Sequence, residues 1–460
     1  MTSRHVRPLL QACLLGLLLT VQASAYLTDT NIRAVPDDGS LYDRDTWNAQ
    51  NGSFPAVNAT YTDPVFGEVV KRLTSTRPTA GDALNNRHRW NADGTKFIRQ
   101  AAASASTVHV LTLTGTQVET SIPGGFGATH QFQWSPFDPD IYYFTDGTAI
   151  LKQRNIATDT TSNVKTFAAT LGTLGGDDLM AAHHSDDTAN PTNLLFLVNY
   201  SSALHVWNQG TNTELTGTMT VSTLSWAGLS PDGKWLIRAD LSSPNNFYSL
   251  PINFATGTVG NGTAAQTGTP FWLGVNFSDH AGIVTLTSGK TYLIVAASAL
   301  ERWTYRVDVS LDQTGNSTTV QAAANKRLFM TDASGQTGNS HFSCGVQGAM
   351  ANYCWSSTED YPETAAAPGT WYANKQEINL VYMPTGKVYR MVHHRSYPLN
   401  NLFAANARVS ATYDGTHALF HSAFGQANAE ASIGYSDTYY LDGTAVTQVK
   451  PWSRRRHGFD

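Results

Sequence analysis

The sequence predicts an all-β fold, a seven-bladed β-propeller built from four-stranded antiparallel blades. Only 14% of the 460 residues are charged, while Thr, Ser and Asn supply much of the polar surface. That balance favours strands and turns over surface helices. A short turn motif recurs seven times at blade-like intervals, and no long amphipathic helix separates the copies. A large β-sandwich or a β-helix is the alternative that this pattern leaves open.

The composition also narrows the class of function. With 41% hydrophobic residues, the chain is neither disordered nor a coiled coil or collagen-like fibre. Its formal net charge is −5, and no basic domain or stripe interrupts the sequence. Nucleic-acid binding depends on such basic surface, so we do not expect a nucleic-acid partner.

Residues 1–25 are predicted to be a secretory signal peptide rather than part of the fold. Arg4 and Arg7 precede the apolar stretch 14–19, and Ala23-Ser24-Ala25 supplies a small-residue cleavage site. No segment has the roughly 18 uninterrupted apolar residues that a membrane-spanning helix needs. We therefore expect a secreted or periplasmic protein without a membrane span, whose mature chain starts near Tyr26 and has a net charge of −7.

The rest of the chain divides into three parts. Residues 26–62 are expected to form an N-terminal extension, residues 63–448 the propeller, and residues 449–460 a basic tail with a frayed, solvated end. The stretch 63–73 is typical of an entry strand, which would close the ring against the last blade.

The repeat that predicts the blades is a polar turn, usually built on Asp-Gly, followed by a β-branched or aromatic strand. Its cleanest copy is Ser230-Pro231-Asp232-Gly233, ahead of Trp235-Leu236-Ile237. The seven copies lie at residues 91–94, 135–140, 185–187, 230–233, 286–289, 343–348 and 412–415. The first four begin 44, 50 and 45 residues apart. Four short strands with their turns need about 40–45 residues, and we interpret the longer later spacings as loop insertions.

Two cysteines remain after the signal peptide, Cys344 and Cys354, ten residues apart across a glycine-containing turn. In an oxidising compartment, two cysteines that face each other across a hairpin are expected to form a disulfide. Two buried free thiols are the alternative.

The candidate site follows from strand direction. The first strand of a blade lines the central channel, and its start lies on the same face as the loop between strands two and three. Residues seven and nine positions before the turn glycine share one strand face. These positions hold Arg87, Trp226, Gly282, His341 and Arg408, and Asn85, Leu224, His280, Asn339 and Asn406. In the second blade, whose turn is longer, His130 corresponds to them.

This set is rich in imidazole and guanidinium groups on a protein that is acidic overall. The concentration of such groups predicts a local site for an anionic ligand. A uronate carboxylate fits the set, and so would sulfate or phosphate.

At the level of the whole chain, residues 60–445 resemble the propeller-type polysaccharide lyases that act on uronate-containing glycans, such as the oligogalacturonate and ulvan lyases. The blade turn, the stretch Asp63-Pro64-x-Phe66-Gly67 and the polar residues ahead of several turns carry the resemblance. It implies a polysaccharide lyase that cleaves an anionic glycan by β-elimination. The alternative is a non-catalytic secreted propeller that binds a glycan or a protein partner through the same face.

β-Elimination assigns a role to each candidate side chain. A cation must neutralise the uronate carboxylate, a base must remove the C5 proton, and an acid or water must protonate the leaving oxygen. Arg408 or Arg87 could neutralise the carboxylate, and His341 or His280 could act as the base. Tyr397, in the long connection before the last blade, is a candidate acid.

We expect no metal cofactor, and a bound divalent metal is the alternative. The oligogalacturonate lyases carry a His-x-His pair that helps to hold a divalent metal, whereas the comparable stretch here reads Asn406-Ala407-Arg408. This departure favours a metal-free site in which arginine neutralises the carboxylate. The adjacent pairs His183-His184 and His393-His394 could each offer only one side chain to a given site, because neighbours on a strand point to opposite faces.

The remaining substrate-binding candidates lie in long connections. The predicted insertion in the sixth blade, Ser356 to Lys375, contains Tyr361 and Trp371, whose rings could stack on sugars or pack over the propeller face. Together with Arg87, His130 and Asn406 they form the expected substrate-binding set. Neither a Gly-x-Ser-x-Gly nor a His-Glu-x-x-His motif is present. Paired carboxylates for glycoside hydrolysis need no local motif, so that chemistry stays open.

Overall fold

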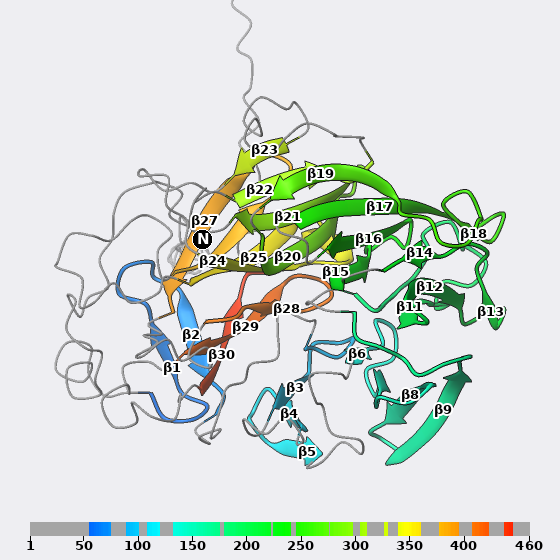
Figure 1. Ribbon diagram of the computed structural model, residues 1–460. Coiled ribbons are helices and arrows are strands. Elements are labelled where there is room, and N and C mark those ends of the chain that lie inside the picture. The colour runs from blue at the N-terminus through cyan, green and yellow to red at the C-terminus, as the bar shows by residue number, and fades with distance from the viewer. Residues whose placement is uncertain are drawn as a thin grey trace, which may run out of the picture.

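The computed structural model describes residues 55–74, 89–100, 108–119, 132–174, 179–221, 224–240, 245–275, 277–297, 304–310, 326–329, 339–359, 377–394, 407–422 and 437–444. These residues form seven antiparallel sheets that follow one another in chain order as the blades of a propeller, which confirms the predicted fold (Figure 1). The helical residues among them are the 3-10 turn Gly348–Met350 and Thr444. The predicted signal peptide and basic tail lie outside the described residues.

The first four blades take up the chain up to Val275, and their strands run from the channel outward. Blade 1 contains β3 (Lys96–Gln100), β4 (Val108–Thr112) and β5 (Gln117–Glu119), with Trp90 bridged to Phe97 at the inner edge. Blade 2 contains β6 (Phe132–Trp134), β7 (Ile141–Thr145), β8 (Ile150–Asn155) and β9 (Thr160–Thr166). Blade 3 contains β10 (Ala181–Ala182), β11 (Leu195–Tyr200), β12 (Ala203–Asn208), β13 (Thr213–Glu214) and β14 (Met219–Thr220). Blade 4 contains β15 (Leu224–Leu229), β16 (Trp235–Asp240), β17 (Asn245–Asn253), β18 (Thr258–Val259) and β19 (Thr269–Val275).

The last three blades complete the ring. Blade 5 contains β20 (Phe277–Thr285), β21 (Thr291–Ala297), β22 (Thr304–Asp308) and β23 (Lys326–Phe329). Blade 6 contains β24 (Asn339–Cys344), β25 (Tyr353–Glu359), β26 (Glu377–Tyr382) and β27 (Lys387–His393). Blade 7 contains β28 (Ser410–Ala411), β29 (His417–Ser422) and β30 (Asp437–Asp442), joined by the N-terminal strands β2 (Val69–Arg72) and β1 (Thr60–Thr62). No helix in the described residues is long and apolar enough to cross a membrane.

In each of the seven blades, the repeat turn connects the innermost strand, or the Trp90 bridge in blade 1, to the next strand outward. In blade 4 the Ser230 hydroxyl accepts hydrogen bonds from the backbone N–H groups of Lys234 and Trp235, at 3.1 and 3.0 Å, and donates to Asp232 at 2.5 Å. Gly233 has a φ of +69°, a left-handed conformation that favours glycine. Asn91 and Thr412 occupy the position of Ser230 in blades 1 and 7. The motif therefore recurs because its side chain closes the turn.

A second repeat, which the sequence analysis missed, joins the third and fourth strands of blades 2, 3 and 4. It reads Asn-x-x-Thr-x-Thr, and each asparagine ends a strand. Its side-chain oxygen accepts the backbone N–H of the first threonine, at 3.1 Å for Thr158, 3.2 Å for Thr211 and 3.1 Å for Thr256. Such Asx-type turns explain the shared Asn-x-x-Thr spacing of these three blades.

The core consists of apolar layers between neighbouring blades. Buried tryptophans anchor several of these layers, among them Trp90, Trp226 and Trp355. Their indoles also link blades directly. Trp90 donates to the carbonyl of Ser410 at 2.9 Å, and Trp355 donates to the carbonyl of Gly415 at 2.8 Å. Blade 7 is thereby held from both sides.

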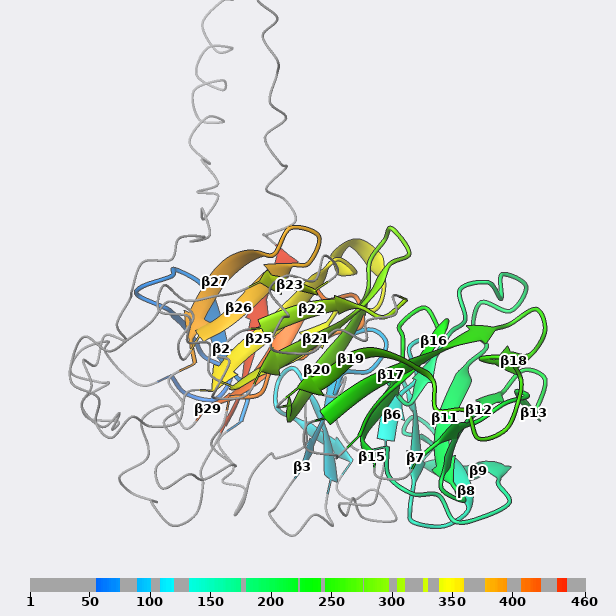
Figure 2. The same ribbon diagram turned by 45° about the horizontal axis from the view of Figure 1, so that its top comes forward.

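The ring closes through strands that are far apart in the sequence. β2 pairs with β30 so that Val70 lies opposite Leu441 and Arg72 opposite Tyr439. Figures 1 and 2 show these N-terminal and C-terminal strands side by side. The buried Arg72 guanidinium forms an ion pair with Asp437 at 2.7 Å across this junction. The entry strand expected within residues 63–73 thus supplies an outer strand of the last blade.

The stretch Asp63-Pro64-x-Phe66-Gly67 has a structural role in this closure. One oxygen of the buried Asp63 carboxylate accepts the N–H groups of Val65 and Phe66, each at 2.9 Å. Its other oxygen accepts the backbone N–H of His393, at the end of β27, at 3.1 Å. The Phe66 and His393 rings lie 4.7 Å apart, centroid to centroid. The motif therefore joins the β1–β2 hairpin to the outer strand of blade 6.

Blade 6 confirms one prediction and corrects another. Cys344 and Cys354 lie opposite each other in β24 and β25 and form the predicted disulfide. The predicted insertion Ser356 to Lys375 begins too early, because Ser356 through Glu359 belong to β25. Ser356 and Ser357 pair with Phe342 and His341 of β24 and are fully buried. A polar stretch forms a strand here because small serines fit between packed blades.

If the buried Arg72–Asp437 pair closes the ring, its loss should lower the free energy of unfolding more than the loss of an exposed ion pair does. Replacing Asp437 with Asn leaves the Arg72 guanidinium buried without its counter-charge, so the free energy of unfolding should fall by about 3–5 kcal/mol. The control is Asp140→Asn, which breaks the part-exposed Lys96–Asp140 pair (3.0 Å) and should cost less than about 1 kcal/mol. Urea denaturation of both variants measures the difference, and equal losses would contradict the closing role of the buried pair.

Candidate functional site

Two arginines and two histidines gather near the starts of the inner strands of blades 6, 7 and 1. His341 lies in β24, Arg408 two residues before β28, Arg89 beside Trp90, and His421 near the end of β29. All four side chains are buried, with exposed fractions of 2% or less. The cluster is therefore shielded from water, which strengthens the electrostatic effect of each charge.

Strand periodicity explains how His341 and Arg408 enter this cluster. In β24, Phe342 and Cys344 pack into the apolar layer with blade 5, so His341 and Ser343 face the other way. Ser343 accepts the backbone N–H of Ala411 in β28 at 2.9 Å, which shows that this second face meets blade 7. In blade 7, Val409 and Ala411 pack toward blade 6 in the same manner, and Arg408 lies on the opposite face.

Arg89 and His421 join blade 1 to blade 7 at the cluster. The Arg89 guanidinium donates a hydrogen bond to Nε2 of His421. Since a guanidinium only donates, Nε2 is the accepting nitrogen and the imidazole proton lies on Nδ1. The backbone N–H of Arg89 also donates to the Ser410 hydroxyl at 3.1 Å. The first contact holds the guanidinium and the second holds the backbone of Arg89, so the residue is in place before any ligand arrives.

The protonation of His341 follows from its surroundings. Burial, and then the positive charges of Arg408 and Arg89, hold the pKa of this imidazole well below its usual value. His341 is therefore neutral near pH 7, beside two cationic side chains. This combination can bind an anion and accept a proton from it in a water-poor setting.

The predicted site residues divide into three groups. The structure brings His341 and Arg408 together. Outside the described residues lie Arg87, His130, Tyr361, Trp371, Tyr397 and Asn406. His280 belongs to β20, but its side chain is outside the described set. Their catalytic and substrate-binding roles stay predictions.

In blade 4, counting back from the turn glycine does not identify a residue that faces the channel. Trp226, at the seventh position, is fully buried in the apolar layer with Ile237, Phe247 and Ile283 instead of facing the channel. The pairing of β15 with β16 is regular from Trp226 to Leu229, and Ala227 and Leu229 pack toward blade 3. Trp226 therefore lies on the opposite strand face, which meets the apolar layer of blade 5.

The count also misses Arg89 and His421. Arg89 lies five residues before Gly94, two positions after the predicted Arg87. His421 lies on the second strand, which the count did not examine. Because Ser410 pairs with Leu419, continuing the register of β28 and β29 by two residues places His421 opposite Arg408. That register could have identified it from the sequence.

The adjacent histidine pairs do not form metal centres in the described residues. Nδ1 of His183 donates to the carbonyl of Asn193 at 2.9 Å, whereas the His184 ring stacks on Phe254 at 4.9 Å. His393 packs on Phe66 next to Asp63. Nowhere in the described part of the chain do three or more His, Cys, Asp or Glu side chains gather so that they could hold a metal ion.

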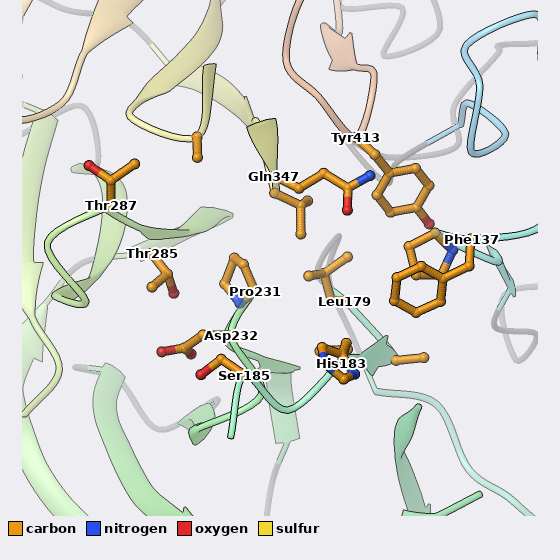
Figure 3. A pocket seen from close by; sticks show the side chains of 15 residues that line it. Phe137, Leu179, His183, Ser185, Pro231, Asp232, Thr285, Thr287, Gln347 and Tyr413 are labelled. Carbon is orange, nitrogen blue, oxygen red and sulfur yellow. The ribbon is translucent and has the colours of Figure 1, made fainter. Parts of the chain in front are cut away.

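A cavity of about 280 Å³ lies at the other end of the inner strands, among the repeat turns. Blades 2 to 7 all contribute to its wall. Figure 3 shows Phe137 and Tyr413 on one side and Thr285 and Thr287 on the other, with His183 and Asp232 between them. Val346 lines this cavity five residues after His341 on the same chain segment, a span of roughly 16 Å in extended backbone. The cavity is therefore separate from the arginine–histidine cluster.

Comparison with known proteins supports the fold. No family model matches the sequence, and no curated protein matches it either. The structure is similar to an oligogalacturonate lyase in complex with manganese, with a TM-score of 0.52 and 16% identity over 85% of this chain and 96% of that one. It also matches the oligogalacturonate lyase from Vibrio parahaemolyticus (TM-score 0.48, 13% identity, 83% and 96% coverage) and a chain of the mitotic checkpoint complex (0.46, 10%, 85% and 94%). At these identities the similarity shows the fold alone, and at that level the resemblance to the propeller-type lyases holds.

The His341 environment predicts how stability depends on pH. Because the folded state lowers the pKa of His341, unfolded chains bind more protons as the pH falls through the unfolded value of about 6.5. This contribution to stability is present above that pH and is lost below it, so the free energy of unfolding should decrease from pH 7.5 to pH 5.5. His341→Asn should reduce that slope. Ser343→Ala changes a residue on the same strand face that does not titrate, so this variant should keep the wild-type pH dependence. Urea denaturation between pH 7.5 and pH 5.5 measures the free energy of unfolding of each variant.

Proposed function

We propose that the protein is an exported polysaccharide lyase that cleaves a uronate-containing glycan by β-elimination. The observation that carries the proposal is the neutral His341 imidazole beside the Arg408 and Arg89 guanidiniums. A base next to cations is what removal of a proton adjacent to a carboxylate requires. The signal-peptide pattern of residues 1–25 supports export.

The arginines would act first. A uronate carboxylate placed against Arg408 and Arg89 has its charge offset, which makes the C5 proton more acidic. As electrons move toward the carboxylate in the transition state, its negative charge grows, and the guanidiniums stabilise it further. The Arg89 guanidinium is already oriented by its hydrogen bond to His421, so little ordering is needed when the substrate binds.

His341 would then take the C5 proton. The bound carboxylate offsets the two positive charges that lower the His341 pKa, so the imidazole becomes more basic when substrate arrives. The C5–H electrons form the C4=C5 double bond while the C4–O bond breaks. The leaving oxygen then takes a proton from water or from an acid such as Tyr397.

The described residues do not fit a metal cofactor at this position. The manganese complex of the similar lyase raises the question, but here two guanidiniums lie where a divalent cation would be repelled. Nε2 of His421 already accepts a hydrogen bond from Arg89. No group of three ligating side chains lies in the described part of the chain, and no step is derived through a metal.

Burial of the cluster favours a second candidate function, a non-catalytic propeller that binds glycan or protein through this face. Arg89, His341, Arg408 and His421 could then serve to hold blades 6, 7 and 1 together. A lyase requires the channel to open when the glycan binds. The two functions differ in whether an unsaturated product forms.

Turnover distinguishes the two functions. The purified protein should release unsaturated uronate product, followed by its absorbance, from at least one of polygalacturonate, ulvan or alginate. His341→Ala should lower turnover by about 10²–10⁴-fold, the usual contribution of one general base. Arg408→Met should also lower turnover. The control Arg238→Lys changes a buried arginine of blade 4, keeps a cation beside Asp240, and should retain activity. Binding of these glycans without product would support the second function instead.

The pH profile tests the link between Arg408 and His341. In the wild-type protein the acid limb of kcat/KM should lie well below pH 6.5, because the free-enzyme imidazole has a lowered pKa. Arg408→Met removes one of the charges responsible, so the limb should move to higher pH in the activity that remains. Arg408→Lys keeps the charge and should leave the limb near its wild-type position. An unchanged limb in Arg408→Met would argue against His341 as the base.

A further inference from the structure

We propose that the cavity among the repeat turns is a binding site for a small, uncharged aromatic molecule that carries a hydroxyl group. This inference is independent of the proposed lyase activity, because the cavity lies at the opposite end of the inner strands from His341 and Arg408. Its volume of about 280 Å³ is near the lower end of the range for ligand pockets, about 300–1,000 Å³. A molecule with a single ring suits that size.

Apolar side chains form most of the cavity wall. Phe137, Leu179, Pro231, Val346 and Tyr413 contribute rings and aliphatic groups from five different parts of the ring of blades. The Tyr413 hydroxyl already donates to the carbonyl of Trp134 at 2.5 Å, so its ring rather than its hydroxyl is available to a ligand. Such a wall favours a ring-shaped apolar ligand and opposes a polyanionic glycan.

His183 supplies a directed acceptor in this apolar wall. Its Nδ1–H donates to the carbonyl of Asn193 at 2.9 Å, which in the neutral imidazole leaves the lone pair on Nε2. Nε2 makes no hydrogen bond to any residue that the structure describes. The ring is also held edge-on by Phe137, with centroids 5.8 Å apart. A ligand hydroxyl could therefore donate to a fixed nitrogen.

Asp232 sets the charge preference of the cavity. Among the described residues that line the cavity, Asp232 is the one with an acidic side chain, and the turn holds its carboxylate in place through Ser230 at 2.5 Å. A carboxylate at the wall repels anionic ligands and accepts hydrogen bonds from donors. The nearby hydroxyl and amide groups of Ser185, Thr285 and Gln347 can donate or accept, so His183 and Asp232 decide the selectivity.

The cavity is built before a ligand binds. The N–H groups of Val346 and Gln347 donate to the carbonyl of Tyr413 at 2.7 and 3.1 Å, which joins the turns of blades 6 and 7. The Ser185 N–H donates to the carbonyl of Asp232 at 2.9 Å, which joins the turns of blades 3 and 4. Little ordering is required of a wall held in this way, so even a small ligand can bind measurably.

The test compares three probes of similar size, namely phenol, toluene and benzoate, by isothermal titration calorimetry at pH 8. Phenol should bind saturably, toluene should bind about 2- to 10-fold more weakly because it lacks the hydrogen bond to His183, and benzoate should not bind. Absence of saturable phenol binding, or benzoate binding as tight as phenol, would overturn the proposal.

The variant His183→Leu removes the acceptor and keeps an apolar side chain. Phenol affinity should fall to that of toluene, while toluene affinity should stay within about twofold. The matched control is His205→Leu, which replaces a part-buried histidine of the same blade that stacks on Tyr200 and does not line the cavity. Phenol binding unchanged in His183→Leu, or equally weakened in His205→Leu, would reject His183 as the acceptor. If His183→Leu does not fold, Leu179→Trp, which fills the cavity, should abolish binding of both phenol and toluene, and retained binding there would also overturn the proposal.

Discussion

The pairing of β2 with β30 joins the two ends of the chain into one sheet, and the remaining blades depend on it. Every blade packs its faces against two neighbours, so an open ring would expose to water the two apolar faces on either side of the gap. The Arg72–Asp437 ion pair lies buried in this junction, and Asp63 extends it to the outer strand of blade 6. Because each contact joins segments more than 300 residues apart, none can form until most of the ring has been assembled.

The arginine–histidine cluster lies where this closure brings blades together. His341, Arg408 and Arg89 come from blades 6, 7 and 1, and blade 7 is the blade that the N-terminal strands complete. Placing two guanidiniums in a buried site carries a large desolvation cost, which packing over the whole ring offsets. The same burial keeps His341 neutral. A site with this electrostatic character therefore depends on the closed ring.

The two ends of the inner strands differ in their side chains, which are basic at one end and mostly apolar at the other. Strand direction explains the difference. In blades 6, 7 and 1 the starts of the inner strands carry basic side chains, whereas the turns around the ring carry Pro231, Phe137 and Val346 around an apolar cavity. A blade needs a tight turn between its first two strands, and Pro and Gly are well suited to such turns. The starts are free of that requirement, so polar residues can accumulate there. One ring can thus present two sites to different ligands.

Local sequence was enough to predict the blades, the turns and the disulfide, because each depends on residues close together in the chain. The Ser-Pro-Asp-Gly turn and the ten-residue spacing of Cys344 and Cys354 are signals of this kind. The meeting of His341 with Arg408 was predicted where the alternation of side chains along the strand is regular. It failed at Trp226, whose side chain packs in the apolar layer with blade 5 instead of facing the channel. The hydrogen bond between Arg89 and His421, and the cavity around His183, were decided by tertiary structure alone. They arise from contacts between blades, and such contacts depend on how seven sheets pack around one axis rather than on any spacing along the chain.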